Sequence, residues 1–290
     1  MAEWINTLLQ GLLTGGLYAL FAAGLSLSFG VMRMINIAHG DFAVLAAYGA
    51  IALAGSLGLN PLETMVTVVP AMAALGYLLQ RLVLNRTLGT DVLRPLLVTF
   101  GFSILIQNLL QEAFTADSRS LHAGPFGTAS LALGGNIAIG LMPLTVMATA
   151  VVSLAGMQWL FSHTALGRAF RAAADDHEVV RLMGVDNRHI YAMAMAIAMA
   201  LVAVAGVFLA LQTNISPSAG PARLLYAFEA VIIGGLGSLW GTLVGGIVLG
   251  LAQAVGAKFS PGWGILAGHL TFLAVLVARP AGLFPASRDR

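Results

Sequence analysis

The sequence holds few side chains that could do chemistry. The most compact group is Asn36-Ile37-Ala38-His39-Gly40-Asp41, inside a long apolar stretch. A carboxylate and an imidazole at membrane depth are costly unless they are paired or hydrated, so Asn36, His39 and Asp41 are candidates for a solute path. Arg33, just before them, favours the alternative that this segment lies at the membrane surface. There, His39 and Asp41 would be structural hydrogen-bonding groups, and the residues alone leave both interpretations open.

Three further polar residues stand in apolar runs. Glu229 heads a glycine-rich run, Gln107 belongs to a polar helix end, and His269 is alone in the last run. Each could line a path, although a polar residue near a helix end is more often interfacial. Glu229 is the strongest of the three candidates, so the residues predicted to line the path are Asn36, His39, Asp41 and Glu229.

No catalytic, metal or cofactor site is predicted. Asp175-Asp176-His177-Glu178 looks like a metal cluster but lacks the His-x-x-x-His spacing that puts two ligands on one helix face. Four nearby arginines offset its charge, which favours a solvated contact surface. The single lysine, Lys258, does not fit a P-loop, and cysteine is absent. The chain is therefore not expected to hydrolyse nucleotide, to carry an enzyme's active site or to bind nucleic acid.

Composition decides the fold class. Of the 290 residues 59% are hydrophobic and 9% charged, and the mean hydropathy is +0.90. A soluble domain carries roughly 25% charged residues. Apolar runs of about 20 residues recur, so we expect an all-α, polytopic transmembrane bundle in a single domain, residues 1–290. About eight spans are predicted: Ile5–Phe29, Ile35–Gly55, Leu62–Leu84, Leu96–Phe114, Leu141–Phe161, Ile190–Leu211, Phe228–Val255 and Gly264–Val277.

The run Phe228–Val255 is unusually long and rich in glycine. Its glycines include Gly234, Gly235 and Gly237, followed by Gly241 and others further on. We predict a broken or re-entrant helix at Gly234 to Ser238, which is tolerated at membrane depth where protein or water covers the freed backbone. The later glycines, from Gly241 on, have an alternative explanation, because small residues let helices pack closely.

The arginines predict the orientation. They concentrate in the loop that follows the third span and in the loop between Ser162 and His189, so the positive-inside rule places both loops in the cytoplasm and the N-terminus outside. With eight crossings the arginine-containing tail would also lie outside, against the rule. Either the glycine-rich run hides another crossing or the tail violates the bias.

The segment 162–189 is a charged island between two apolar runs. We predict a short cytoplasmic helix from about Leu166 to Met183, with Gly184 as its C-terminal cap and Asp186 as the cap of the next helix. Such an element offers a surface to another protein. Its candidate contact residues are Gly167, Arg168, Arg171, Asp176, Leu182 and Gly184.

Together these motifs resemble a known family. The opening, from Gly15-Gly16-Leu17-Tyr18 through Asn36 to Asp41, is similar to that of the branched-chain amino acid ABC transporter permeases. Gly167-Arg168-Ala169 with Leu182-Met183-Gly184-Val185 resembles their coupling loop, and Ile233 to Ser238 with Gly241 resembles their C-terminal signature. The match covers nearly the whole chain and is closest to the shorter of the family's two permease types.

The resemblance implies a subunit of an importer in a bacterial inner membrane. Its expected partners are a second homologous permease, two cytoplasmic ATP-binding subunits and an extracytoplasmic substrate-binding protein, and its cargo is a small solute. Related importers carry urea and amides, so the solute stays open. A secondary transporter would need paired intramembrane charges for ion coupling, and the sequence has few.

Overall fold

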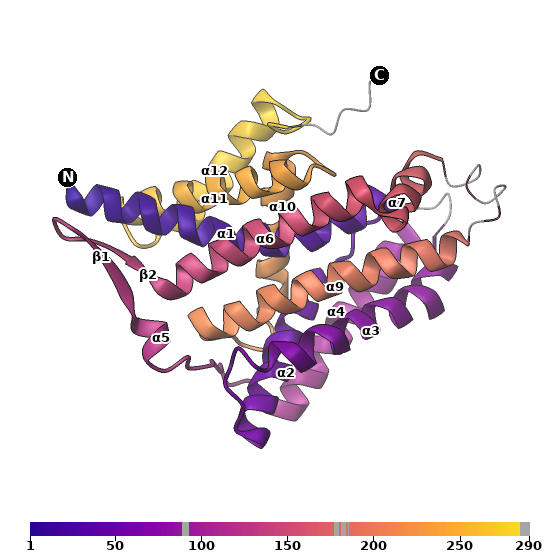
Figure 1. The fold of residues 1–290 in the computed structure, drawn as a ribbon, viewed down its shortest axis with the longest axis horizontal. Helices are drawn as coiled ribbons and strands as arrows, with labels where there is room; N and C mark the ends of the chain where they lie inside the picture. Colours follow the sequence, from indigo (N-terminus) through magenta and orange to yellow (C-terminus); the bar gives the residue numbers. More distant parts are fainter. Residues whose placement is uncertain (89–92, 177–179, 181–183, 185, 285–290) are drawn as a thin grey trace.

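The computed structural model describes residues 1–88, 93–176, 180, 184 and 186–284. Within these ranges the chain is almost entirely helical, as predicted (Figure 1). The elements are α1 (Ala2–Met32), α2 (His39–Leu57), α3 (Met65–Leu82), the 3-10 turn η1 (Leu84–Arg86), α4 (Leu93–Phe114), α5 (Pro125–Thr128), β1 (Ser130–Gly134), β2 (Ile137–Gly140), α6 (Leu141–His163), α7 (Ala165–Asp175), α9 (Asn187–Gln212), α10 (Gly220–Gly234), α11 (Leu239–Phe259) and α12 (Trp263–Ala278).

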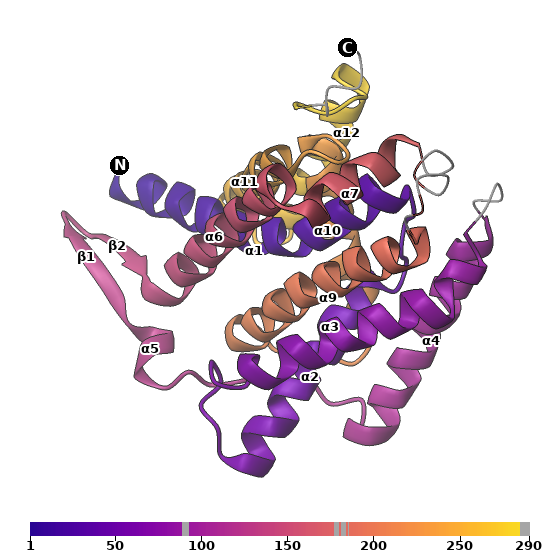
Figure 2. The ribbon, with the colours of Figure 1, turned by 45° about the vertical axis from the view of Figure 1, so that its right-hand side comes forward.

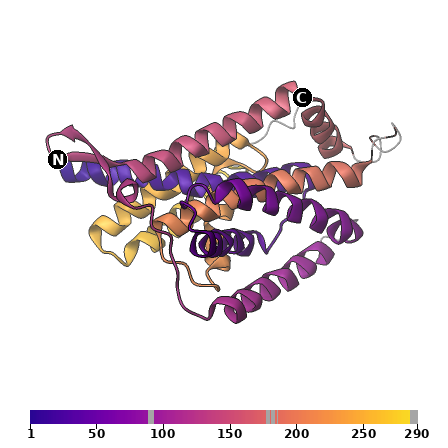
Figure 3. The same cartoon turned by 60° about the horizontal axis from the view of Figure 1, so that its bottom comes forward.

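Seven helices in the described ranges are long and apolar enough to cross a membrane. At 15 and 16 residues, α10 and α12 fall short of the roughly 20 residues that a span needs. The long helices α1, α6 and α9 lie side by side, while α7 and the β-hairpin occupy opposite ends of the bundle (Figures 1 and 3). We refer to these ends as the α7 end and the hairpin end.

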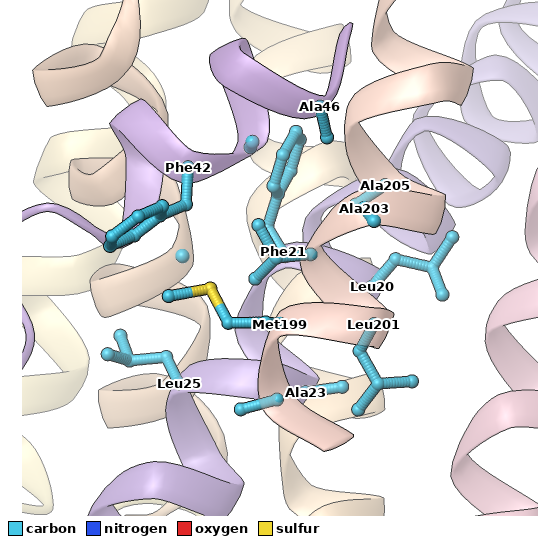
Figure 4. Close-up of a cluster of buried hydrophobic side chains, with 14 of the residues drawn as sticks. Leu20, Phe21, Ala23, Leu25, Phe42, Ala46, Met199, Leu201, Ala203 and Ala205 are labelled. Carbon is cyan, nitrogen blue, oxygen red and sulfur yellow. The ribbon is translucent and has the colours of Figure 1, made fainter. Parts of the chain in front are cut away.

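The core forms where α1, α2 and α9 meet. Phe21, Phe42 and Met199 pack there among alanines and leucines, and all three are nearly inaccessible (Figure 4). Helix α1 is buried on all sides over most of its length, so it shows no amphipathic stripe. It is the central helix of the molecule.

The helices form two repeats of opposite direction. The first repeat is α1 to α4 and the second is α9 to α12. Helix α11 packs antiparallel to α1, through Gly246 on Gly15 and Lys258 on Glu3. Helix α3 packs antiparallel to α9 in the same way, through Gly76 on Met195 and Arg81 on Asp186. Helices α2 and α10 meet between them, so each repeat contributes one short central helix (Figure 2).

The structure corrects the predicted span Phe228–Val255. This run is two antiparallel helices, α10 and α11, and α10 already begins at Gly220. The chain therefore reverses direction inside this run, although α10 itself is too short to count as a span. After α12 the tail returns to the end of α10, where the Leu283 amide donates to the Ile233 carbonyl (2.9 Å). The described tail thus lies at the α7 end, with most of the arginines.

The sequence analysis missed the β-hairpin. Its strands pair Leu131 with Ile139, and Gly135 and Asn136 form the turn with φ of 59° and 63°. Two successive residues at positive φ are typical of a type I′ turn, for which Gly and Asn are the preferred residues. The Gly135-Asn136 pair between short apolar segments was the available signal.

Candidate functional site

Helix α2 begins deep inside the bundle. The chain turns at Arg33 (φ 52°) and runs back along α1, so that the His39 ring nitrogen Nε2 lies 2.8 Å from the carbonyl of Phe21. Phe21 lies 11 residues before the end of α1, which is about 16 Å along the helix. His39 therefore lies well inside the helix bundle and away from the end of α1.

All three predicted polar residues of this segment are buried and hydrogen-bonded. The Asn36 side chain accepts from the Ala38 amide (3.0 Å), and Asp41 accepts from the Gln107 amide nitrogen of α4 (2.9 Å). Asn36, His39 and Asp41 are 0%, 2% and 0% exposed. The residues thus fix where α2 starts and connect it to α1 and α4.

Helix α10 begins at the same place. A Cβ added to Gly40 would lie 2.0 Å from the Gly220 carbonyl oxygen, and one added to Gly220 would lie 2.0 Å from Asp41 Oδ1. Only glycine permits this contact, so the two helix N-termini converge on one carboxylate. A helix N-terminus carries a partial positive charge, which stabilises a nearby anion. We call this arrangement, Asn36 to Asp41 together with Gly220, the central junction.

Glu229 lies on α10, beyond the junction. It is 1% exposed, and its Oε1 is 2.5 Å from Nδ1 of His269 on α12, whose side chain is 32% exposed. The His269 ring stacks on Tyr226. His269 was expected to be alone in its span, but the structure pairs it with the carboxylate that sequence analysis had singled out.

Sequence reasoning missed three residues beside this pair. Arg223 and Tyr226 fall in a stretch that was interpreted as a loop before Phe228, and Gln253 sits on α11. The Tyr18 hydroxyl of α1 donates to Gln253 Oε1, and its ring lies 5.3 Å from that of Tyr226. An arginine six residues before a glutamate in an apolar segment was the signal. We call Arg223, Tyr226, Glu229, Gln253 and His269 the polar face.

The predicted helix break lies between α10 and α11. Gly235 and Gly237 have φ of 106° and 79°, in the region that favours glycine. A Cβ on Gly234 would lie 2.1 Å from the Gly241 carbonyl oxygen, which explains why both positions are small. The Ser238 side chain caps α11 by accepting from the Gly241 amide (3.1 Å).

The coupling-loop residues lie around α7. Gly167 makes the tight turn from α6 possible, because a Cβ there would lie 2.2 Å from the Leu160 carbonyl oxygen. Arg168 and Arg171 are exposed. The single helix predicted from Leu166 to Met183 is wrong: α7 ends at Asp175, where an acidic side chain opposes the helix dipole, and Asp176 is extended.

The rest of this loop is only partly described. Leu182 lies outside the described residues. Gly184 has φ of 81°, the conformation expected of a C-terminal cap. The prediction for Asp186 is confirmed, because its side chain caps α9 by accepting from the Arg188 amide (3.0 Å).

Comparison with known proteins identifies the family. The family model described as "Branched-chain amino acid transport system / permease component" matches residues 7–277. The chain belongs to this family. It is 32% identical to the high-affinity branched-chain amino acid transport permease BraD of Pseudomonas aeruginosa, over 97% of this chain and 95% of BraD. It is 25% identical to LivH of Escherichia coli, over 97% and 95% of the two chains.

Two further matches are more distant. The chain is 26% identical to LivM of Escherichia coli over 94% of its own length and 69% of LivM. Among solved structures, PsaBC from Streptococcus pneumoniae in complex with Fab shares 15% identity at a TM-score of 0.48, covering 92% of this chain and 90% of that one. The family and the long apolar helices together make the chain a multi-pass membrane permease.

In this permease a cavity separates α7 from the helix break. It has a volume of about 590 Å³ and is lined by Arg171 and Asp175 of α7, by Ser26 and Gly30 of α1 and by the Gly237 to Trp240 segment. The Arg33 guanidinium also donates to the Ala174 carbonyl (3.2 Å), which ties the end of α1 to α7.

Proposed function

We propose that this chain is a membrane-spanning permease subunit of an ATP-binding-cassette importer that translocates branched-chain or related amino acids. The chain itself hydrolyses no ATP. The observation that carries the proposal is the family match, which covers residues 7–277 and is described as a branched-chain amino acid permease component. The central junction, where α2 and α10 start inside the bundle, supports a transport path through the middle of the molecule.

The path residues have two different tasks in this proposal. Asn36, His39 and Asp41 hold the helix ends in place, because their hydrogen bonds run to the start of α2, to the backbone of α1 and to Gln107 of α4. Glu229 faces the solute, since its partner His269 is partly exposed. Gly234, Gly235, Gly237 and Gly241 permit the break that lets α10 move relative to α11.

The proposed partners follow from the family and from the shape of the α7 end. Relatives of two types, LivH and LivM, both match this chain, which supports a second homologous permease beside it. Residues 162–189 dock one of two cytoplasmic ATP-binding subunits through Gly167, Arg168, Arg171, Asp176, Leu182 and Gly184. An extracytoplasmic binding protein delivers the solute at the hairpin end, and the membrane is a bacterial inner membrane.

The orientation rests on the arginines. Arg33, Arg81, Arg171 and Arg279 belong to segments at the α7 end, whereas Arg119 pairs with Ile215 near the hairpin end. Positive residues accumulate on the cytoplasmic side of membrane proteins. The α7 end is therefore the cytoplasmic end, and the N-terminus is outside.

The test is reconstitution of the whole transporter. The permease is co-expressed with the ATPase, second permease and binding protein encoded near it, and the purified complex is placed in vesicles. We expect uptake of leucine, isoleucine or valine that needs both ATP and binding protein. Uptake of urea or acetamide in preference to these would replace the proposed solute, and uptake driven by an ion gradient without ATP would refute the proposal.

A further inference from the structure

The polar face contains three polar atoms that lack a partner. Within the described ranges, the Nε of Arg223, the Oε2 of Glu229 and the Nε2 of Gln253 are shielded from solvent and make no hydrogen bond. Buried polar atoms are nearly always paired, and unpaired charged groups are the most costly. Two others, Asn36 Nδ2 and Asp41 Oδ2, lie in the closed central junction. The three atoms of the polar face lie beside the partly exposed His269 ring, where a ligand can reach them, and we take them as the sign of a ligand.

The three atoms have a definite pattern. Arg223 and Gln253 offer N–H donors, and Glu229 offers an acceptor. Tyr226 lies one turn after Arg223 and one turn before Glu229 on α10, and its ring contacts those of Tyr18 and His269, so the two charged residues flank one aromatic contact. An α-amino acid has the complementary arrangement, because its carboxylate accepts hydrogen bonds and its ammonium donates them.

The cluster also lies beside an open surface at membrane depth. Leu225, one turn before Glu229 on the same side of α10, is 43% exposed, and Ala222 is exposed as well. Helix α10 starts at the central junction, so this surface lies well inside the bundle's thickness. Charged side chains at such depth face a water-filled cavity or a protein partner rather than lipid.

From these observations we infer that the polar face is a transient binding site for the charged ends of an α-amino acid on its way through the permease. Arg223 and Gln253 hold the carboxylate, and Glu229, positioned by His269, holds the ammonium. Leu225 and the rings of Tyr18 and Tyr226 contact the apolar side chain. This inference rests on the proposed function and names the part of the molecule that distinguishes amino acids from urea or amides.

The chain's lack of cysteine permits a direct test. Leu225→Cys is labelled in the purified complex with a charged methanethiosulfonate, which reaches only water-exposed thiols, and modification of this subunit is followed by mass. The matched control is Leu105→Cys in the middle of α4, where the side chain is 49% exposed on the outside of the molecule. We expect Leu225→Cys to react at least tenfold faster.

Protection then identifies the ligand. Millimolar leucine should slow labelling of Leu225→Cys at least threefold, whereas 4-methylpentanoate and 3-methylbutylamine, which each lack one charged end, and urea should not. Adding Arg223→Gln should abolish protection, measured as the ratio of the labelling rates with and without leucine in that same variant. Ala222→Cys serves as a second reporter if Leu225→Cys misfolds.

Three labelling results would overturn the proposed amino-acid site. Labelling no faster than that of Leu105→Cys would mean that lipid or the second permease covers the face, and it would overturn the inference. Equal protection by urea, or none by leucine, would do the same. Protection of Leu225→Cys by leucine requires binding but no ATP-driven transport. The proposed function is tested separately, because it is refuted if the wild-type complex shows no ATP-driven uptake.

Discussion

Asp41 and Glu229 are carried by corresponding helices of the two repeats, but they lie at different places along them: Asp41 is in the first turn of α2, whereas Glu229 is more than two turns beyond the start of α10. In the first repeat α2 carries Asp41, which accepts from Gln107 of α4; in the second, α10 carries Glu229, which pairs with His269 of α12. Asp41 is enclosed between two helix N-termini, whereas the Glu229 pair borders a partly open surface. The same architecture thus supplies one carboxylate to hold helices together and one to meet a solute.

The two repeats also differ in how closely their helices pack. Helices α10, α11 and α12 pack closely on one another, while α4 contacts mainly α2 and lies on the outside of the molecule (Figure 3). The positive-φ glycines of the break, Gly235 and Gly237, belong to the second repeat. The expected contrast therefore concerns the two carboxylates: substitution of Asp41 should lower stability, and substitution of Glu229 should lower transport at nearly constant stability.

The largest effect should come from Gly40→Ala at the central junction. The new Cβ would lie 2.0 Å from the Gly220 carbonyl oxygen, which is backbone and cannot turn away. Overpacking of this kind costs about 3 kcal/mol. The matched control is Gly49→Ala on the same helix, where no heavy atom lies within 4 Å. Thermal unfolding in detergent measures both, and equal melting temperatures would show that the junction is not tightly packed in solution.

The next contrast sets Asp41→Ala against Glu229→Gln. Asp41→Ala leaves the Gln107 amide and two helix N-termini without their acceptor, which should cost about 2 kcal/mol and reduce uptake as well. Glu229→Gln keeps the size of the side chain and a hydrogen-bonding group for His269, so its unfolding should change by less than about 1 kcal/mol.

Uptake by Glu229→Gln should nevertheless fall at least tenfold. The measurement is ATP-driven leucine uptake beside thermal unfolding of the same preparations, with Asp41→Asn as a variant that retains the acceptor oxygen. If Glu229→Gln is strongly destabilised, or if Asp41→Ala has wild-type stability, then Asp41 and Glu229 do not differ in the way proposed, with one stabilising the fold and the other serving transport.

A moderate effect on coupling is expected from α7. Arg171→Glu reverses an exposed charge beside the cavity that leads to the helix break, and Gly184→Leu disfavours a residue with φ of 81°, at a local cost of about 1 kcal/mol. Both variants should insert normally, as checked by protease access. Stimulation of ATP hydrolysis by loaded binding protein should fall severalfold in each, and Arg171→Lys should behave as wild type. Full stimulation in both would reject α7 and its loop as the docking element.

The sequence predicted most of the helices but little of the site's geometry. Long apolar runs and glycine clusters define spans and breaks locally, so the break at Gly235 was readable. The return of the chain from Arg33 to His39 was not, because it depends on Phe21 and Gln107, which are distant in sequence. Arg223 was missed because α10, with 15 residues, is shorter than the apolar run by which a membrane span is recognised. The hairpin was missed because its strands are only five and four residues long.

The smallest predicted effect concerns the Arg81–Asp186 ion pair, which holds α3 against the start of α9 at the α7 end. The two side chains are 37% and 53% exposed, and their N···O distance is 2.7 Å. An exposed pair of this kind contributes only a small fraction of the effect expected of Gly40→Ala. If packing along Gly76 and Met199 is what joins α3 to α9, Arg81→Gln should lower the free energy of unfolding by no more than this amount at pH 7. Arg86→Gln, on the adjoining 3-10 turn, controls for the loss of one charge.

The pH dependence of the Arg81→Gln effect gives the sharper test. The hydrogen bond from Arg81 holds the pKa of the Asp186 carboxyl below its usual range, and partial burial opposes this only weakly. A lowered folded-state pKa means that the pair's contribution is complete above the unfolded value, about 3.9, and is lost as the pH falls through the folded value. The difference between wild type and Arg81→Gln should therefore be constant from pH 5 to 8 and shrink as the pH falls below about 4. A difference that does not shrink in acid, or that exceeds the Gly40→Ala effect, would place the main attachment of the first repeat at this rim instead of at the central junction.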